Sequence, residues 1–153
     1  MNGVKTRLVI PALALLGLGD ALYLAVLHLQ GEVPPCGSYG GCAQVNTSPY
    51  AEIFGIPVAA FGALLYVVVL GVGWGRLWTR GTVYARATLF LYSLTLSGAI
   101  FMAYLTGVEA MVLHAFCYWC LGLAAITFVL LALVGSELWA FDSQIVPARA
   151  GRL

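Results

Sequence analysis

Charge is what this sequence most conspicuously lacks. Its 153 residues include seven Lys and Arg and six Asp and Glu, so charged residues make up 8%, about a third of the usual ~25%. So few charges cannot cover the surface of a soluble domain of this size, which excludes a soluble enzyme and a disordered chain. The formal net charge of +1 is too small for a nucleic-acid partner. With 62% hydrophobic residues, the sequence indicates an integral protein of the lipid bilayer.

Four apolar stretches are long enough to cross a bilayer, which takes about 20 residues. They cover residues 8–29, 53–75, 87–108 and 115–136. None alternates with period two, and hydrocarbon offers no water to backbone groups, so all four are expected to be helices. A cleaved signal peptide is a poorer explanation of the first stretch, because Asp20 interrupts it and no clear cleavage site follows. The sequence predicts one all-α membrane domain over residues 1–153, a bundle of four transmembrane helices.

The basic residues predict how the bundle is oriented. With four crossings, all seven fall on one side of the membrane: Lys5, Arg7, Arg76, Arg80, Arg86, Arg149 and Arg152. The other side, residues 30–52 and 109–114, contains no Lys or Arg. Because cytoplasmic segments are rich in Lys and Arg, both termini are expected in the cytoplasm.

The only four cysteines all lie toward the outer side. Cys36 and Cys42 are in the long outer loop, and Cys117 and Cys120 open the fourth apolar stretch. The outer compartment is oxidising, so disulfides persist there. Four cysteines allow three pairings, and sequence alone does not choose among them. The natural pairing joins Cys36 to Cys42 across three glycines and Cys117 to Cys120 on one helical face.

Two dithiol pairs at one surface favour a relay of electrons. The loop pair can move and would collect electrons from a soluble dithiol, whereas the helix pair would pass them on through a mixed disulfide. The dipole of the fourth helix favours the thiolate of Cys117 in its first turn. A membrane-soluble acceptor of two electrons is then needed, which points to a quinone.

Two other interpretations of the cysteines remain open. They could form structural disulfides, although a ring of four residues constrains little of the unfolded chain. Four thiolates could instead hold zinc or a softer metal, as in a metal transporter or chaperone. Covalent haem is not expected, because Leu121 rather than His follows Cys120.

These motifs together resemble the vitamin K epoxide reductase family in its bacterial form. The likeness covers residues 8–137 and consists of three motifs: Cys36-x5-Cys42, the run Ser48-Pro49-Tyr50-Ala51-Glu52-Ile53-Phe54-Gly55-Ile56-Pro57, and Cys117-Tyr118-Trp119-Cys120. A DsbB-type oxidase also has four spans and two cysteine pairs, but its C-x-x-C precedes the second span.

The resemblance implies both the chemistry and its setting. The bundle would surround a quinone (ubiquinone or menaquinone), with Cys120 against the ring and Cys117 exchanging with a loop cysteine. Ser48 would stand in a short helical segment that acts as an outer lid. The protein would lie in the inner membrane of a bacterial cell and reoxidise a thioredoxin-like partner that makes disulfides in exported proteins. Because the chain ends soon after the fourth stretch, that partner is expected to be a separate protein.

Further residues are candidates for contact with the quinone. Animal members of the family hold vitamin K with an Asn and a Tyr, whose positions here are Ala51 and Ala124, which argues against reduction of vitamin K epoxide. The small Ala124 would leave room for a ring or an isoprenoid tail, and Phe54 and Tyr104 could form walls of the pocket. Asp20 is a carboxylate within the first stretch, where it either makes a structural hydrogen bond or helps to move protons near the quinone.

Overall fold

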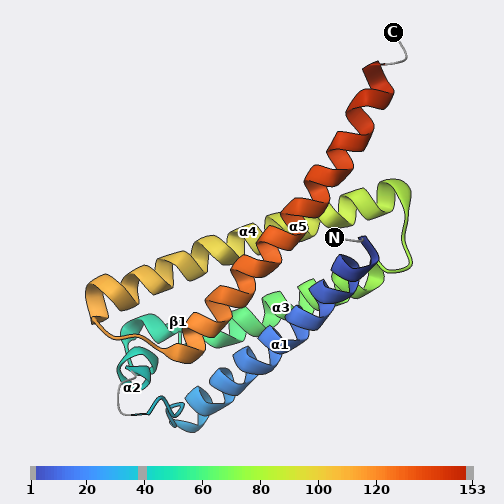
Figure 1. Ribbon diagram of the computed structural model, residues 1–153. Helices are drawn as coiled ribbons and strands as arrows, with labels where there is room; N and C mark the ends of the chain where they lie inside the picture. Colours follow the sequence, from blue (N-terminus) through green and yellow to red (C-terminus); the bar gives the residue numbers. More distant parts are fainter. Residues whose placement is uncertain (1–2, 38–40, 151–153) are drawn as a thin grey trace.

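The computed structural model describes residues 3–37 and 41–150, and Figure 1 shows its four long helices. These are α1 (Gly3–Gln30), α3 (Val58–Gly75), α4 (Gly81–Val108) and α5 (Tyr118–Ala150). Each contains a segment long and apolar enough to cross a membrane. The prediction of an all-α, multi-pass membrane bundle is confirmed.

The helices pack around a core of apolar and small residues. Helix α1 lies against α3 and α5, and α4 lies against α5 and α3. Tyr66 is fully buried in the centre, where its hydroxyl donates to the carbonyl of Leu123 at 3.1 Å and lies 2.8 Å from Thr127 Oγ1. A Cβ at Gly17 would collide with the Tyr66 ring. Glycine at this position therefore lets α1 approach α3 closely, as small residues do in membrane bundles.

Short elements gather at one end of the bundle, remote from the α3–α4 connection (Figure 1). Between α1 and α3 come α2 (Cys42–Asn46), η1 (Pro49–Ala51) and a hairpin of β1 (Glu52–Ile53) and β2 (Ile56–Pro57). We call residues 42–57 the lid segment. His28 Nε2 at the end of α1 lies 2.8 Å from Glu52 Oε1, which ties the lid segment to the bundle. The π-helical turn η2 (Glu109–Leu113) continues α4 at this same end.

The second span begins later than the sequence predicts. Residues 53–57 were expected to be helical, but they belong to the hairpin, in which Glu52 pairs with Pro57 and Ile53 with Ile56. Its two turn residues, Phe54 and Gly55, have φ of 54° and 78°, as tight two-residue hairpin turns require. Apolarity alone does not reveal such a turn, so helix α3 starts at Val58.

The third and fourth spans also differ from their expected bounds. Helix α4 begins at Gly81 rather than at residue 87, and η2 extends it beyond residue 108. Glu109, expected to end the span at the surface, is therefore buried, with 3% of its area exposed. The last helix begins at Tyr118, three residues later than expected, and continues past residue 136.

A buried polar cluster joins three helices at the opposite end. Arg76 is 1% exposed, and its Nη1 donates to Thr88 Oγ1 and to Glu137 Oε2, both at 2.9 Å. The Tyr84 hydroxyl donates to the same Glu137 oxygen at 3.1 Å. A charge this deeply buried is stable only when it is paired. The cluster thus fastens the end of α3 to α4 and α5.

Removing one member of the Arg76–Glu137 ion pair should destabilise the bundle strongly. We expect Glu137→Leu to cost about 3 kcal/mol of unfolding free energy, because it leaves the Arg76 guanidinium buried and unpaired. The double variant Arg76→Met/Glu137→Leu should recover most of that loss, since no charge remains. Unfolding in mixed detergent micelles measures both. Arg86→Met, which removes an exposed cation from α4, is the control, and an equally unstable double variant would contradict the interpretation.

Candidate functional site

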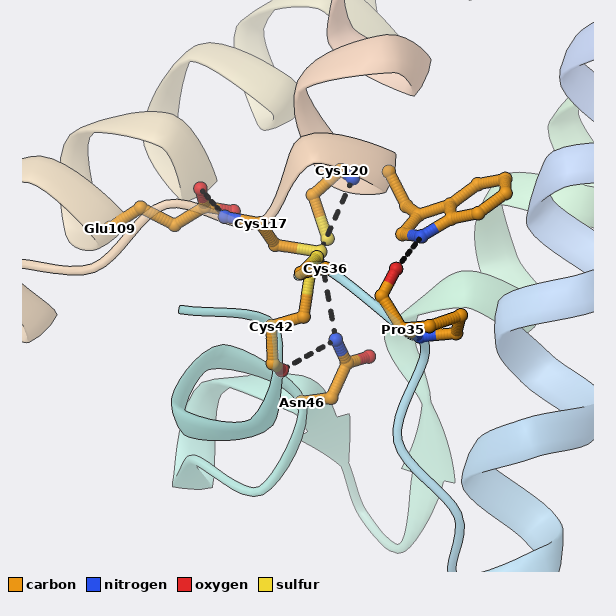
Figure 2. The surroundings of a disulfide bond; sticks show 8 residues. Pro35, Cys36, Cys42, Asn46, Glu109, Cys117 and Cys120 are labelled. Carbon is orange, nitrogen blue, oxygen red and sulfur yellow. Dashed lines mark hydrogen bonds between the residues drawn. A yellow bond between two sulfur atoms is a disulfide. The ribbon is translucent and has the colours of Figure 1, made fainter. Parts of the chain in front are cut away.

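Three sulfur atoms from distant parts of the chain meet at the end of the bundle that carries the lid segment. Cys36 and Cys42 form a disulfide with their Cα atoms 5.9 Å apart. Cys117 Sγ lies 3.4 Å from Cys42 Sγ, and all three sulfurs lie within 4.8 Å of one another (Figure 2). Cys117 and Cys120 are free thiols. The first of the two natural pairs is therefore bonded, and the second is present as a dithiol beside it.

Gly41 allows Cys42 to come this close to Cys117. Its N–H donates to the carbonyl of Phe116 at 2.9 Å, so the two backbones run in contact just before each cysteine. A Cβ at Gly41 would collide with the side chain of Ala115. The same Cβ would lie only 3.0 Å from Ala115 Cα and 3.1 Å from Phe116 N. Backbone atoms cannot move aside as a flexible side chain can, so this approach requires glycine.

Other hydrogen bonds hold the loop against α5 and η2. The Trp119 indole N–H donates to the carbonyl of Pro35 at 3.2 Å, next to Cys36 (Figure 2). Gln44 Nε2 donates to the carbonyl of Leu113 at 2.8 Å. The loop is thus fixed on both sides of the disulfide.

Cys117 stands where a helix best stabilises a thiolate. It precedes Tyr118, the first residue of α5, and the Cys120 N–H donates to its sulfur at 3.5 Å, in the manner of a helix cap. Asn46 Nδ2 is a further donor at 3.6 Å. The Cys120 thiol contributes most, and together with these N–H donors it lowers the pKa of Cys117 from 9.0 to about 7, against the opposing effects of burial and of Glu109. Cys117 therefore carries more thiolate near neutral pH than an ordinary thiol, which is mostly protonated.

The two thiols of the C-x-x-C, at the start of α5, have different surroundings. Cys117 is completely buried against the loop disulfide, while Cys120 lines an apolar cavity beneath the lid segment. The apolar lining comes from all four long helices and from the lid segment, and includes Leu24, Val45, Ala51, Ala59, Met102, Leu105 and Leu123. The polar lining includes His28, Asn46, Ser48 and Glu109. An apolar cavity with a few polar groups beside a reactive thiol fits the ring and tail of a quinone.

The model of the vitamin K epoxide reductase family matches residues 8–134, which is most of the sequence. The chain belongs to this family. A comparison with curated proteins finds no match. Membership of the vitamin K epoxide reductase family makes the protein an oxidoreductase acting on thiols and disulfides, in a family that uses quinones and redox partners.

The residues predicted to contact the quinone of this family lie in different places. Ser48 and Ala51 line the apolar cavity. Ala124 is buried on α5 but lies outside that lining. Phe54 is at the tip of the hairpin, fully exposed, and Tyr104 is exposed on α4. Of the six candidates, Asp20 among them, the structure thus brings two, Ser48 and Ala51, to the cavity.

Asp20 lies deeper in the bundle than the apolar cavity. Its side chain faces α5 at Gly122, where a Cβ would lie 3.5 Å from Asp20 Oδ2. In the part of the chain that the structure describes, its buried Oδ1 has no hydrogen-bond partner. The structural hydrogen bond considered from the sequence is therefore not formed at this oxygen.

Two residues of the site, Asn46 and Glu109, were not predicted from the sequence. Asn46 follows Cys42 by one helical turn, and its Nδ2 donates to the carbonyl of Cys42 at 3.0 Å as well as toward Cys117. Glu109 accepts the N–H of Cys117 on its Oε2 at 3.1 Å (Figure 2). The signal for Glu109 was its position at the end of an apolar stretch shortly before the C-x-x-C, which we interpreted as a boundary.

Enlarging Gly41 should separate the two exchanging sulfurs. In a Cys36→Ser/Cys120→Ser background, only Cys42 and Cys117 can bond, and we expect diamide to join them rapidly. Adding Gly41→Ala should slow this reaction at least tenfold, because even a shift of about 1 Å disrupts reactive geometry. Mass spectrometry of the linked peptides measures the rate. Gly71→Ala, whose Cβ would meet nothing within 4 Å, is the matched control, and equal rates in both variants would rule out the packing argument.

Removing the Asn46 amide should raise the pKa of Cys117, because a hydrogen bond to the thiolate is lost. Asn46→Ala should therefore lower the thiolate fraction of Cys117 near pH 7. As the pH rises toward 9, the thiolate fraction of the variant should approach that of the wild type. Ultraviolet absorbance of the thiolate, with Cys117→Ser as the baseline, measures this titration. Thr47→Ala changes an exposed neighbour that bonds only to the Ala43 carbonyl, so it should leave the titration unchanged. An unshifted pKa in Asn46→Ala would show that the amide is immaterial.

Proposed function

We propose that the protein reoxidises a thioredoxin-like partner and passes the electrons to a membrane quinone, either ubiquinone or menaquinone. One observation carries this proposal: Cys117 touches the loop disulfide on one side, while Cys120, one helical turn away, lines an apolar cavity on the other. The two pairs thus connect an outer dithiol with a lipid-soluble acceptor.

In the first step, a partner thiolate attacks Cys36. Cys36 is partly exposed, whereas Cys42 is 1% exposed and covered by Cys117. The Cys36–Cys42 bond breaks, Cys36 becomes joined to the partner, and Cys42 leaves as a thiolate. The second thiol of the partner then attacks its own bonded sulfur, so that the partner leaves as a disulfide and the loop pair is reduced.

In the second step, the Cys42 thiolate attacks Cys117 of an oxidised Cys117–Cys120 pair and releases Cys120. Cys36 then attacks Cys42 and releases Cys117 as a thiolate, which its pKa of about 7 favours. The products are a loop disulfide and two thiols on α5. This is the arrangement of bonds found in the structure.

In the third step, Cys117 and Cys120 become a disulfide again. A quinone bound in the cavity supplies the acceptor for two electrons and two protons. Leu24, Ala51, Met102 and Leu123 would pack against it and keep water away from the Cys120 sulfur. Cys120 is the thiol on this path because Cys117 lies outside the cavity lining.

We place the cysteines on the outer face of a bacterial inner membrane, with both termini in the cytoplasm. This orientation is supported by the charges: Arg76 and Arg80 lie near the α3–α4 connection, at the end opposite the cysteines. Disulfide exchange also needs the oxidising outer compartment.

The closeness of three sulfurs also favours a second function, the binding of a soft metal ion. That function requires the loop disulfide to be reduced, because thiolates are the ligands. Stoichiometric zinc or copper in the reduced protein, with no reaction toward quinone, would support it against the relay.

Substituting single cysteines should separate the two halves of the relay. Replacing any of the four by Ala should abolish sustained oxidation of the reduced partner, because each makes one of the required bonds. Cys36→Ala and Cys42→Ala should nevertheless still reduce quinone when a small dithiol such as DTT replaces the partner, since Cys117 and Cys120 are intact. Quinone absorbance under anaerobic conditions measures both reactions.

The matched comparison is the pair of variants Cys117→Ala and Cys120→Ala, which should fail with DTT as well. Partner oxidation at the normal rate by a loop-cysteine variant would refute the relay. Failure of the wild-type protein to reduce quinone from either donor would refute the proposed acceptor.

A further inference from the structure

A buried carboxylate in the cavity has no part in the electron relay described above. Among the described residues, Glu109 is the one acidic side chain that lines the apolar cavity, and only 3% of its area is exposed. It lies at the end of a membrane-spanning helix, where a carboxylate is costly and tends to be functional. Its burial therefore needs an explanation.

The contacts of Glu109 link it to both cysteines of the C-x-x-C. Its Oε2 accepts the Cys117 N–H at 3.1 Å (Figure 2), and the Cys120 thiol is its second polar neighbour. The described ion pairs are those of His28 with Glu52 and of Arg76 with Glu137. Glu109 thus forms no ion pair among the described residues, so no cation holds it as a carboxylate.

We propose that Glu109 is the proton-transfer residue of the quinone step, taking the proton of the Cys120 thiol and delivering it to a quinone oxygen. This inference rests on the proposed function. Glu109 and Cys120 line the same cavity from η2 and from α5, so a molecule bound there lies against both.

The step balances in protons and electrons. The Cys120 S–H bond breaks, the Cys117–Cys120 bond forms, and an electron pair passes to the quinone. The proton of Cys120 goes to the Glu109 carboxylate, which then gives it to a quinone oxygen and is a carboxylate again. The second proton comes from water and replaces the one that Cys117 released on becoming a thiolate.

The other polar groups near the cavity are less suited to this transfer. His28 is bound to Glu52 at 2.8 Å, and the Ser48 hydroxyl donates to the carbonyl of Val45 at 2.7 Å. Asp20 interacts with Cys120 only at longer range and lies outside the cavity lining. Among these groups, Glu109 combines a place in the cavity lining with contacts to the Cys117 N–H and to the Cys120 thiol.

A purely structural role for Glu109, as an acceptor that caps α5, is the competing explanation. Glu109→Gln separates the two, because the amide oxygen can still accept the Cys117 N–H but cannot carry the proton. We expect the variant to fold with an unchanged Tm and to retain its KM for a short-chain ubiquinone. Its kcat with DTT should fall about 100-fold, as loss of a general acid–base group predicts, and Glu109→Asp should restore part of it.

A second readout needs no quinone. When diamide oxidises Cys117 and Cys120 in quinone-free protein, infrared difference spectra should gain a carboxylic acid band that Glu109→Gln abolishes. Glu32→Gln, an exposed glutamate outside the apolar cavity, should preserve both the band and the turnover. Wild-type turnover by Glu109→Gln, or a band that this substitution leaves unchanged, would overturn the inference.

A failure of the Glu109 proposal can be distinguished from a failure of the proposed function. In Glu109→Gln, the single-turnover transfer from the partner to Cys117 and Cys120 should proceed normally, because Cys36, Cys42 and both α5 thiols remain. If the wild-type protein itself fails to reduce quinone, the proposed function is wrong irrespective of Glu109.

Discussion

The contact between Cys42 and Cys117 governs the chemistry at this end of the bundle. Disulfide exchange requires sulfur atoms to touch, and a separation of 3.4 Å leaves no space for another group between them. Two covalently remote segments reach this distance because Gly41 presents no side chain to Ala115 and because their backbones share a hydrogen bond. The relay therefore depends on backbone packing as much as on the cysteines themselves.

The two ends of the bundle handle buried polarity in opposite ways. At the end with the α3–α4 connection, Arg76 and Glu137 neutralise each other and are further bonded to Thr88 and Tyr84, which holds three helices together. At the end that carries the lid segment, Glu109 forms no ion pair among the described residues, and the donors to Cys117 are a thiol and N–H groups rather than cations. Groups without a compensating charge can change protonation at modest cost. One end is thus suited to stability and the other to reaction.

The features of the fold that depend on hydrophobicity could be predicted from the sequence. Those that depend on local backbone geometry could not. The lengths of the apolar stretches predicted four helices, and the cysteine pattern indicated the family. Both features depend only on which residue types occur at which positions. The hairpin at Phe54 and Gly55 was missed, since positive φ angles interrupt a run that is apolar throughout. Glu109 was taken for a boundary because charge normally marks a membrane surface, whereas here a π-helical turn carries it into the bundle. The role of Asn46 depends on a contact between segments that no local pattern encodes.

The spacing of the C-x-x-C explains how one short motif can join two environments. Three residues along a helix keep Cys117 and Cys120 on the same face, close enough to bond, yet the first lies at the helix end and the second within the bundle. Cys117 is thereby surrounded by N–H donors that favour a thiolate, and Cys120 by the apolar lining of a cavity. In the proposed function, forming their disulfide would release an electron pair beside this apolar cavity. A spacing of two residues would place the sulfurs on opposite faces of the helix, where they could not bond.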